Sequence, residues 1–318
     1  MSLVTSTAFQ NSSAIQTRAF IALGTLATSD VDDDFLYQML VALKLALSQA
    51  NETDTISVVS MLRCICKIVP SLPHTSRYIC PLFWLAVALL QSSHMSFYVE
   101  ATQLLGVTLE NMELRGMFKQ GSVSSTLLDG RSAFEDVACQ LDQMLGLAFD
   151  ASFSFSLASV IFKGVRYSGL KESAKAVLRT LLCVTVRSFE KENEGVNGFR
   201  DSLCPDALGY FLALIPLSTT PAAYRGLLKD CHIDEAWLPE AGPELGETDG
   251  VPRIALGFLG VNDTTASLLV TSFIGAILSS AQGDDAETEI LYSLLSDIAV
   301  VFPETVSMMY VILMLYSW

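Results

Sequence analysis

The residues of this chain that could bind a metal ion are few and poorly spaced. Cys64 and Cys66 form a Cys-x-Cys pair, and Cys231 is followed directly by His232. Zinc sites usually have paired ligands at fixed spacings, and neither fragment has a second half nearby. In a helix, the two side chains of a Cys-x-Cys pair point about 200° apart, which is poor geometry for chelation. We therefore predict structural thiols and assign no metal ligand.

The common catalytic signatures are also missing from the sequence. No G-x-S-x-G motif occurs, and the three histidines lie in polar turns or in an acidic stretch. The stretch "GVRYSGLKES" holds two glycines, but its lysine is misplaced for a phosphate-binding loop. The acidic run Asp32, Asp33 and Asp34 is better explained by the start of a helix than by a cation site. We therefore expect a protein that is not an enzyme, with no catalytic residue and no cofactor.

The composition indicates a folded protein that does not bind polyanions. Hydrophobic residues make up 51% of the 318 residues and charged residues 17%, which is far from a disordered composition. Lys and Arg number 19 against 34 Asp and Glu, so the formal net charge is −15. This excess of acidic groups argues against nucleic-acid binding and against electrostatic docking on anionic lipid. Other proteins are the expected partners.

The mean hydropathy of +0.44 raises the question of membrane spans. The longest apolar runs are Ile79–Leu90, Leu268–Leu278 and Val306–Trp318. All three are shorter than the roughly 18–20 apolar residues that cross a bilayer, so we predict core helices and no transmembrane segment. The N-terminus has no basic region followed by a long apolar block, and the seven cysteines are odd in number and scattered. Reduced thiols and a cytoplasmic location follow as expectations.

Hydrophobic periodicity predicts an all-α fold. Segments that begin at Ala14 and at Ser29, and a third that includes Val58, each carry apolar residues three or four positions apart. The first two segments form a hairpin of about 35–40 residues, the size of a HEAT-type repeat, and the pattern recurs downstream. We therefore predict an α-solenoid of HEAT/armadillo-like helical hairpins. The predicted buried faces are Ile15, Ala19, Ala22, Leu23 and Leu26 in the first helix, Phe35, Met39, Ala42, Leu43 and Ala46 in the second, and Val58, Leu62, Ile65 and Val69 in the third.

Four regions are predicted along the chain. Residues 1–191 form the helical-repeat array, and residues 192–229 form an irregular helical segment. Residues 230–262 are rich in acidic residues, Pro and Gly, which predicts an exposed, flexible loop. Residues 263–318 form the final helices, which end inside an apolar stretch without a capping repeat. Because solenoids need capped ends, we expect a truncated array or a piece of a longer protein.

Two local features add detail to this prediction. Ser29 or Asp30 can cap the second helix. Lys171, Lys175 and Arg179 share one helix face at i, i+4 and i+8, and form a modest basic cluster with Arg166 of the preceding helix. A solvated face is the default interpretation of this cluster, and a surface for an acidic partner is the alternative.

Four stretches of the chain resemble a known family. They are "NSSAIQTRAFIALG", "PLFWLAVALLQ", "LDQMLGLAFDASFSFSLASVIFKGVRYS" and "EILYSLLSDIAVVFPETV", in this order. Together they closely resemble the C-terminal helical-repeat region of neurofibromin-type Ras GTPase-activating proteins, including the fungal members. The likeness covers about two-thirds of the chain. These are core-packing stretches and not catalytic motifs, so they indicate a family without marking a site.

The resemblance implies a segment of a large cytoplasmic negative regulator of Ras. In that family a central domain inserts an arginine finger to accelerate GTP hydrolysis, and a lipid-binding module follows it. The region seen here is similar to the part after both, whose implied role is an α-solenoid scaffold that supports self-association. The parent would be peripheral at membranes through its other domains. No arginine-finger segment occurs here, so Ras would be engaged by a domain outside this chain.

One departure from the family concerns nuclear targeting. Animal members carry a basic nuclear-localisation stretch before the final helices, whereas residues 230–262 are short and acidic. Nuclear targeting is therefore not carried over. Two other classes of function stay open from the sequence. One is a free-standing HEAT or armadillo adaptor that binds protein partners, and the other is a helical membrane protein.

Overall fold

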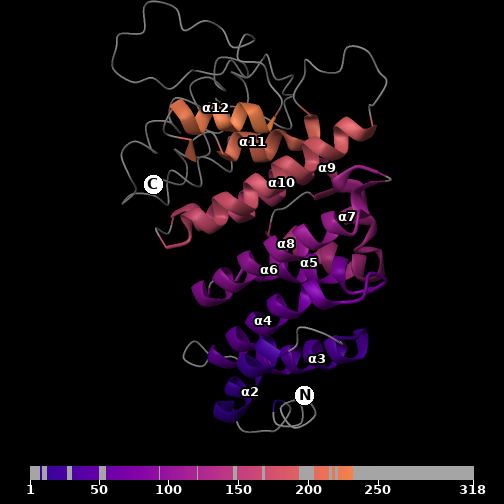
Figure 1. The fold of residues 1–318 in the computed structure, drawn as a ribbon, viewed down its shortest axis with the longest axis vertical. Coiled ribbons are helices and arrows are strands. Elements are labelled where there is room, and N and C mark those ends of the chain that lie inside the picture. The colour runs from indigo at the N-terminus through magenta and orange to yellow at the C-terminus, as the bar shows by residue number, and fades with distance from the viewer. Residues whose placement is uncertain are drawn as a thin grey trace, which may run out of the picture. The chain divides into compact units, whose positions relative to one another are not determined.

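The computed structural model shows a helical protein (Figure 1). No strand occurs among the residues that the structure describes, so the predicted all-α class is confirmed for them. The predicted loop and final helices lie outside these residues, apart from positions 230 and 231. The described residues are 13–26, 31–49, 55–92, 94–119, 121–145, 149–166, 169–192, 204–214 and 221–231, with the single positions 8, 217 and 218.

The chain divides into two compact units. The N-terminal unit comprises Met1–Gly121 and Ser125–Ala138, and the C-terminal unit comprises Ser122–Ser124 and Cys139–Trp318. The division falls inside the range 1–191 that was predicted as one array, and it crosses α8 (Glu135–Leu145).

In the N-terminal unit, from α2 to α6, every second helix packs on the next, and each helix between them packs on the helix that follows it. Its α-helices α2 and α6 both pack on α4, while α3 packs on α4 and α5 packs on α6. The chain therefore places α2, α4 and α6 in contact in sequence order, with α3 and α5 beside them. The elements are α2 (Ser13–Leu26), α3 (Asp33–Gln49), α4 (Ile56–Ile68), η1 (Val69–Ser71), α5 (Ile79–Leu89), α6 (Met95–Leu114), η2 (Met117–Lys119), α7 (Val123–Asp129) and η3 (Ser132–Phe134).

Helix α4 is the core helix of the N-terminal unit. The four residues predicted to form its apolar face, Val58, Leu62, Ile65 and Val69, are all buried. Further apolar residues on other faces of α4 are buried as well, because neighbouring helices cover it from more than one side. The α-helix gives way to a 3-10 turn at η1, which contains Pro70, because proline cannot donate the next helical hydrogen bond.

Helix α2 departs from its predicted face. Ala19 and Leu23 are buried as expected, but Ile15 and Leu26 are each about half exposed. Phe20, which was not predicted to lie on the buried face, is fully buried. A bulky aromatic side chain buries more area than either aliphatic residue, so the helix turns toward Phe20.

Gly24 allows α2 to approach α4 closely. A Cβ atom at Gly24 would lie 3.2 Å from the Cα atom of Cys64. This is tighter than ordinary van der Waals contact, so a larger residue at position 24 would push the two helices apart.

The ends of two helices follow simple capping rules. Asp32 caps α3, because its carboxylate accepts a hydrogen bond from the backbone N–H of Phe35 at 2.8 Å. The predicted caps, Ser29 and Asp30, lie outside the described residues. Helix α6 ends at Leu114, and Gly116, two residues later, has a φ of 68°, the left-handed conformation that glycine adopts readily.

The described part of the C-terminal unit is also helical, and α11 packs against both α9 and α10. The crossing of α9 and α11 depends on Gly209, where a Cβ atom would lie 2.5 Å from the backbone carbon of Ser154. The short "FSFS" alternation of Phe153–Ser156, a period typical of a strand, lies within α9. The elements are α9 (Phe149–Phe162), η4 (Lys163–Arg166), α10 (Lys171–Glu192), η6 (Pro205–Ala207), α11 (Leu208–Leu214) and α12 (Pro221–Asp230).

Candidate functional site

The Cys-x-Cys pair is buried and faces two different helices. Cys64 lies against Gly24 of α2, whereas the thiol of Cys66 donates to the backbone carbonyl of Glu100 on α6 at 3.9 Å. Burial raises the pKa of both thiols to about 12, and the nearby Glu100 carboxylate adds to the rise at Cys66. Neutral thiols that point to different helices contribute to packing, since metal binding and nucleophilic attack require a thiolate.

The other residues considered for metal binding or catalysis are scattered. His74 is exposed in the loop before α5. His94 precedes α6, with its ring 5.0 Å from that of Phe97. Cys231 is buried, and burial raises its pKa strongly, while His232 lies outside the described residues.

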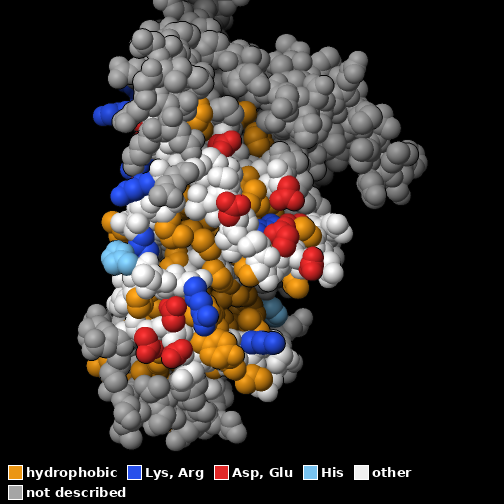
Figure 2. Space-filling model, turned by 90° about the vertical axis from the view of Figure 1, so that its right-hand side faces the viewer, with side chains coloured by type: hydrophobic (Ala, Val, Ile, Leu, Met, Phe, Trp, Pro, Cys, Tyr) orange, Lys and Arg blue, Asp and Glu red, His pale blue; other side chains and the backbone are white. Residues whose placement is uncertain are grey.

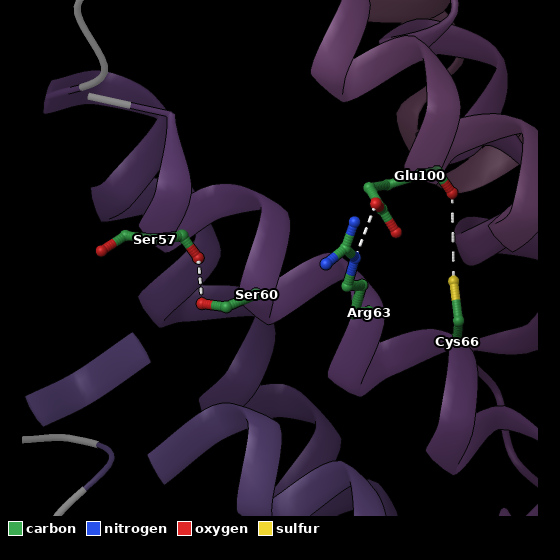
Figure 3. A network of polar contacts seen from close by, with 5 residues as sticks. All are labelled: Ser57, Ser60, Arg63, Cys66 and Glu100. Carbon is green, nitrogen blue, oxygen red and sulfur yellow. Dashed lines mark hydrogen bonds and ion pairs between the residues drawn. The ribbon is translucent and has the colours of Figure 1, made fainter. Parts of the chain in front are cut away.

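A buried carboxylate connects α4 and α6. The side chain of Glu100 is 1% exposed, and its Oε1 accepts from Arg63 Nε at 2.7 Å, although the Arg63 side chain is 59% exposed. The other carboxylate oxygen, Oε2, is buried and has no hydrogen-bond partner among the described residues. Figure 3 shows Arg63 extending from α4 to meet this carboxylate, with Cys66 beneath the Glu100 carbonyl. An acidic group is thus held in the core largely by one surface cation.

A buried arginine shows the opposite arrangement. The Arg131 side chain is 0% exposed, whereas its partner Glu135 is 40% exposed, and two nitrogens of Arg131 meet the Glu135 carboxylate at 3.0 and 3.2 Å. The guanidinium carbon of Arg131 lies 4.7 Å from the centre of the Trp84 ring, which is a cation–π contact. Trp84 in turn donates from Nε1 to the backbone carbonyl of Leu127 at 2.8 Å. These contacts fix α7 and the following turn to α5.

The three acidic residues at the start of α3 have different surroundings. Asp32 caps the helix, and Asp34 is exposed. Asp33 accepts from the hydroxyl of Ser76 at 2.5 Å and from the backbone N–H of Arg77 at 3.3 Å. The prediction of helix-start acids is therefore confirmed for Asp32, and Asp33 also joins α3 to the loop before α5.

The end of α6 binds the same loop. Arg115 donates from Nη2 to the carbonyl of Leu72 at 2.8 Å and from Nη1 to the carbonyl of Pro73. Partial burial lowers the pKa of Arg115, and the negative charge of Asp33 partly offsets that shift. The loop between η1 and α5 is thus held from two helices.

The basic cluster of α10 binds groups within its own unit. Lys175 donates to the carbonyl of Leu217 at 3.0 Å, and Arg179 pairs with Asp230 of α12 at 2.6 Å. The Asp230 carboxylate raises the pKa of Arg179. Both residues thus bind groups of their own unit, although the Arg179 side chain is still 55% exposed, so the face is solvated but these two cations are not free.

Exposed apolar side chains are concentrated near the N-terminus. Figure 2 shows hydrophobic side chains at the surface of the described residues, between acidic and basic ones. Among the described residues, seven of the nine large hydrophobic residues that are exposed belong to α2, α3 or the first position of α4. They are Ile15, Ile21, Leu26, Tyr37, Val41, Leu45 and Ile56. The periodicity of the sequence predicted Ile15 and Leu26 to be buried and gave no sign of this concentration.

The polar groups that matter most in the structure were not selected from the sequence. Arg63, Glu100 and Arg131 are single charged residues, which the sequence alone suggests are exposed. The sequence does indicate the burial of Glu100, because it is the only charged residue in "FYVEATQLL" and lies on the same helical face as Phe97 and Leu104. Arg131 follows a short helix and carries no comparable pattern.

Comparisons with known proteins give little further information. No model of a known protein family matches the chain. The crystal structure of an engineered protein is similar at 12% sequence identity, covering 94% of this chain and 96% of that chain, with a TM-score of 0.38. This similarity is too low to support an argument about the fold. None of the described helices combines the length and the apolar character needed to cross a lipid bilayer.

Proposed function

We propose that this chain is a non-catalytic helical-repeat scaffold segment of a neurofibromin-type negative regulator of Ras. The scaffold part of the proposal is supported by the packing of α2, α4 and α6 on one another in chain order. In an array of stacked hairpins, equivalent helices of successive hairpins contact each other, and their partner helices form a second layer. Helix α3 packs on α4 and α5 packs on α6, so these pairs would form the hairpins of the array, whereas α2 and α3, predicted as the first hairpin, are not among the helix pairs that pack closely.

The internal bonding of the charged groups also supports a framework role. Glu100, Arg131 and Arg179 each join two helices or a helix and a turn. The cysteines of α4 have raised pKa values and are therefore poor nucleophiles. These contacts stabilise helix packing and do not bring an acid, a base and a nucleophile together.

The link to Ras is supported by the four resembling stretches of sequence. In this proposal the parent protein stimulates GTP hydrolysis through a domain outside this chain, and the helical array positions that domain and supports self-association. The parent would be cytoplasmic and would reach membranes through its other domains.

The direct test is a GTPase assay. The purified chain should leave the rate of GTP hydrolysis by Ras at its intrinsic value, while a Ras GTPase-activating domain in the same assay raises that rate by orders of magnitude. Acceleration by the chain alone would contradict the non-catalytic assignment. The coding sequence upstream of this chain tests the family, because it should encode a GTPase-activating domain.

A free-standing adaptor is the second candidate function. The exposed apolar residues of α3 favour it, because adaptors built from helical hairpins bind partners through such surfaces. An upstream coding sequence that lacks a GTPase-activating domain would support this candidate over a Ras regulator.

A further inference from the structure

Three of the exposed apolar residues form a continuous stripe on α3. Tyr37, Val41 and Leu45 are separated by four residues each, and each side chain is about half exposed. At 1.5 Å per residue the stripe is about 12 Å long, or a little more than two helical turns. The opposite side of α3 carries Leu36, Met39 and Leu43, which are buried against the rest of the unit. Helix α3 is thus apolar on two faces, and one of them is open.

The spacing of the stripe defines how a helix could pack on it. Residues four positions apart form a ridge that is inclined to the helix axis. When such ridges from two helices interdigitate, the axes cross at about −50°, the commonest class of helix packing. A partner helix with apolar residues at i, i+4 and i+8 therefore has the matching surface.

The charges around the stripe favour a basic partner. Asp32 and Asp34 are exposed at the start of α3, where the exposed Arg77 lies close to Asp33 and Asp34, and Lys44 is the one basic residue of the helix itself. Residues 1–56 contain six acidic and two basic residues, a net charge of −4 within a chain of net charge −15. A second copy of the chain would bring like charges together, whereas a basic helix would be attracted.

We propose that the stripe Tyr37, Val41 and Leu45 is a docking site for a basic amphipathic helix of a protein partner. The apolar residues of that helix would pack on the stripe, and its Lys or Arg residues would lie near Asp32 and Asp34. This inference goes beyond the proposed function, because it holds whether or not the chain belongs to a Ras regulator.

The experiment uses the full chain and three labelled synthetic peptides, with fluorescence anisotropy as the readout. The first peptide is a helix of about 18 residues with Leu at i, i+4 and i+8 and Lys at the exposed positions. The second has the same composition in scrambled order, and the third has Glu in place of Lys. We expect micromolar binding of the first peptide and at least tenfold weaker binding of the other two.

Matched variants locate the binding surface. Val41→Asp should weaken binding of the first peptide at least tenfold, and Tyr37→Ser should weaken it less. Val137→Asp should have no effect, because it changes a valine of α8 that is even more exposed than Val41 and is not part of α2, α3 or α4. Because the changed residues are exposed, the circular dichroism spectrum and melting temperature of each variant should match those of the unchanged chain.

Three results would overturn the proposal. Equal binding of the scrambled peptide would show that charge alone attracts the probe. Unchanged binding to Val41→Asp would place the probe elsewhere. Self-association of the unchanged chain in sedimentation, abolished by Val41→Asp, would show that the stripe is occupied by a second copy.

Discussion

Two buried ion pairs in the N-terminal unit differ in which member is inside. In the pair of Arg63 with Glu100, the acid is buried and the cation is mostly exposed. In the pair of Arg131 with Glu135, the cation is buried and the acid is partly exposed. One atom of each buried group, Oε2 of Glu100 and Nη1 of Arg131, has no hydrogen-bond partner among the described residues, but the buried guanidinium also lies over the Trp84 ring.

This difference shows where each pair is vulnerable. A buried charge is costly unless it is paired and hydrogen-bonded, so removal of the outer partner leaves the inner charge without compensation. Glu100 depends on Arg63 more than Arg131 depends on Glu135, because the indole ring still faces the guanidinium when Glu135 is changed. Loss of the outer partner should therefore destabilise the chain more at Arg63 than at Glu135.

The largest effect is expected for Arg63→Met. The substitution keeps most of the aliphatic stem but leaves the Glu100 carboxylate buried without its cation, so the free energy of unfolding should fall by about 3 kcal/mol. Urea unfolding followed by circular dichroism measures this loss. Arg63→Lys is the control and should lose less, because the positive charge remains. A loss below about 1 kcal/mol for Arg63→Met would show that water solvates Glu100 despite its burial.

A smaller effect is expected for Glu135→Gln. The amide keeps the shape of the side chain and removes its charge, while the contact of Arg131 with Trp84 persists. Because Glu135 is also partly exposed, the free energy of unfolding should fall by only about 1 kcal/mol. If the same unfolding experiment gives a loss equal to that of Arg63→Met, the indole ring does not compensate for the buried guanidinium.

The double substitution Arg63→Met with Glu100→Leu should restore most of the stability. It replaces the buried pair with apolar groups of similar size, and such exchanges are often neutral or stabilising. We expect a free energy of unfolding within about 1 kcal/mol of the unchanged chain. A double variant as unstable as Arg63→Met alone would mean that packing, and not the stranded charge, explains the first result.

The smallest effect is expected at the thiol of Cys66. Burial is the main cause that raises its pKa to about 12, and the nearby Glu100 carboxylate is the second cause. Glu100→Gln removes only the second cause, so the pKa of Cys66 should fall slightly and stay above the ordinary thiol value. The folded state holds the proton more tightly than the unfolded state. The stability from this thiol is therefore complete below the ordinary thiol pKa of 9.0 and decreases as the pH rises toward about 12.

The measurement for Cys66 is a difference titration of thiolate absorbance against a Cys66→Ser variant. An unchanged pKa in Glu100→Gln would show that the carboxylate does not act on this thiol. A pKa near the ordinary value in the unchanged chain would show that Cys66 is accessible to water.

The sequence predicted the helices well where one apolar pattern dominates. The face of α4 is fully buried as predicted, because its spacing of apolar residues is regular and neighbours cover it. The buried face of α2 was predicted only in part. Ala19 and Leu23 are buried as predicted, but the packing of Phe20 against the rest of the unit leaves Ile15 and Leu26 about half exposed. The solenoid arrangement and the family remain predictions.

The buried charges were harder to predict for a physical reason. Glu100 is buried beside Arg63, which another helix brings within hydrogen-bond distance, and Arg131 is buried beside Trp84 of α5, although its ion-pair partner Glu135 is only four residues away. Likewise, the contacts of Lys175 and Arg179 are made with Leu217 and Asp230, which follow α10 in the chain. Periodicity describes one helix at a time and contains no information about such contacts.

Trp84 gives the N-terminal unit an internal optical probe. Its indole N–H is bonded to a backbone carbonyl, its ring is almost fully buried, and a guanidinium lies over its face. When α7 separates from α5, this ring becomes hydrated, and its fluorescence emission shifts to longer wavelength. The chain has two other tryptophans, Trp237 and Trp318, and replacing both with Phe would make the emission report on this one contact.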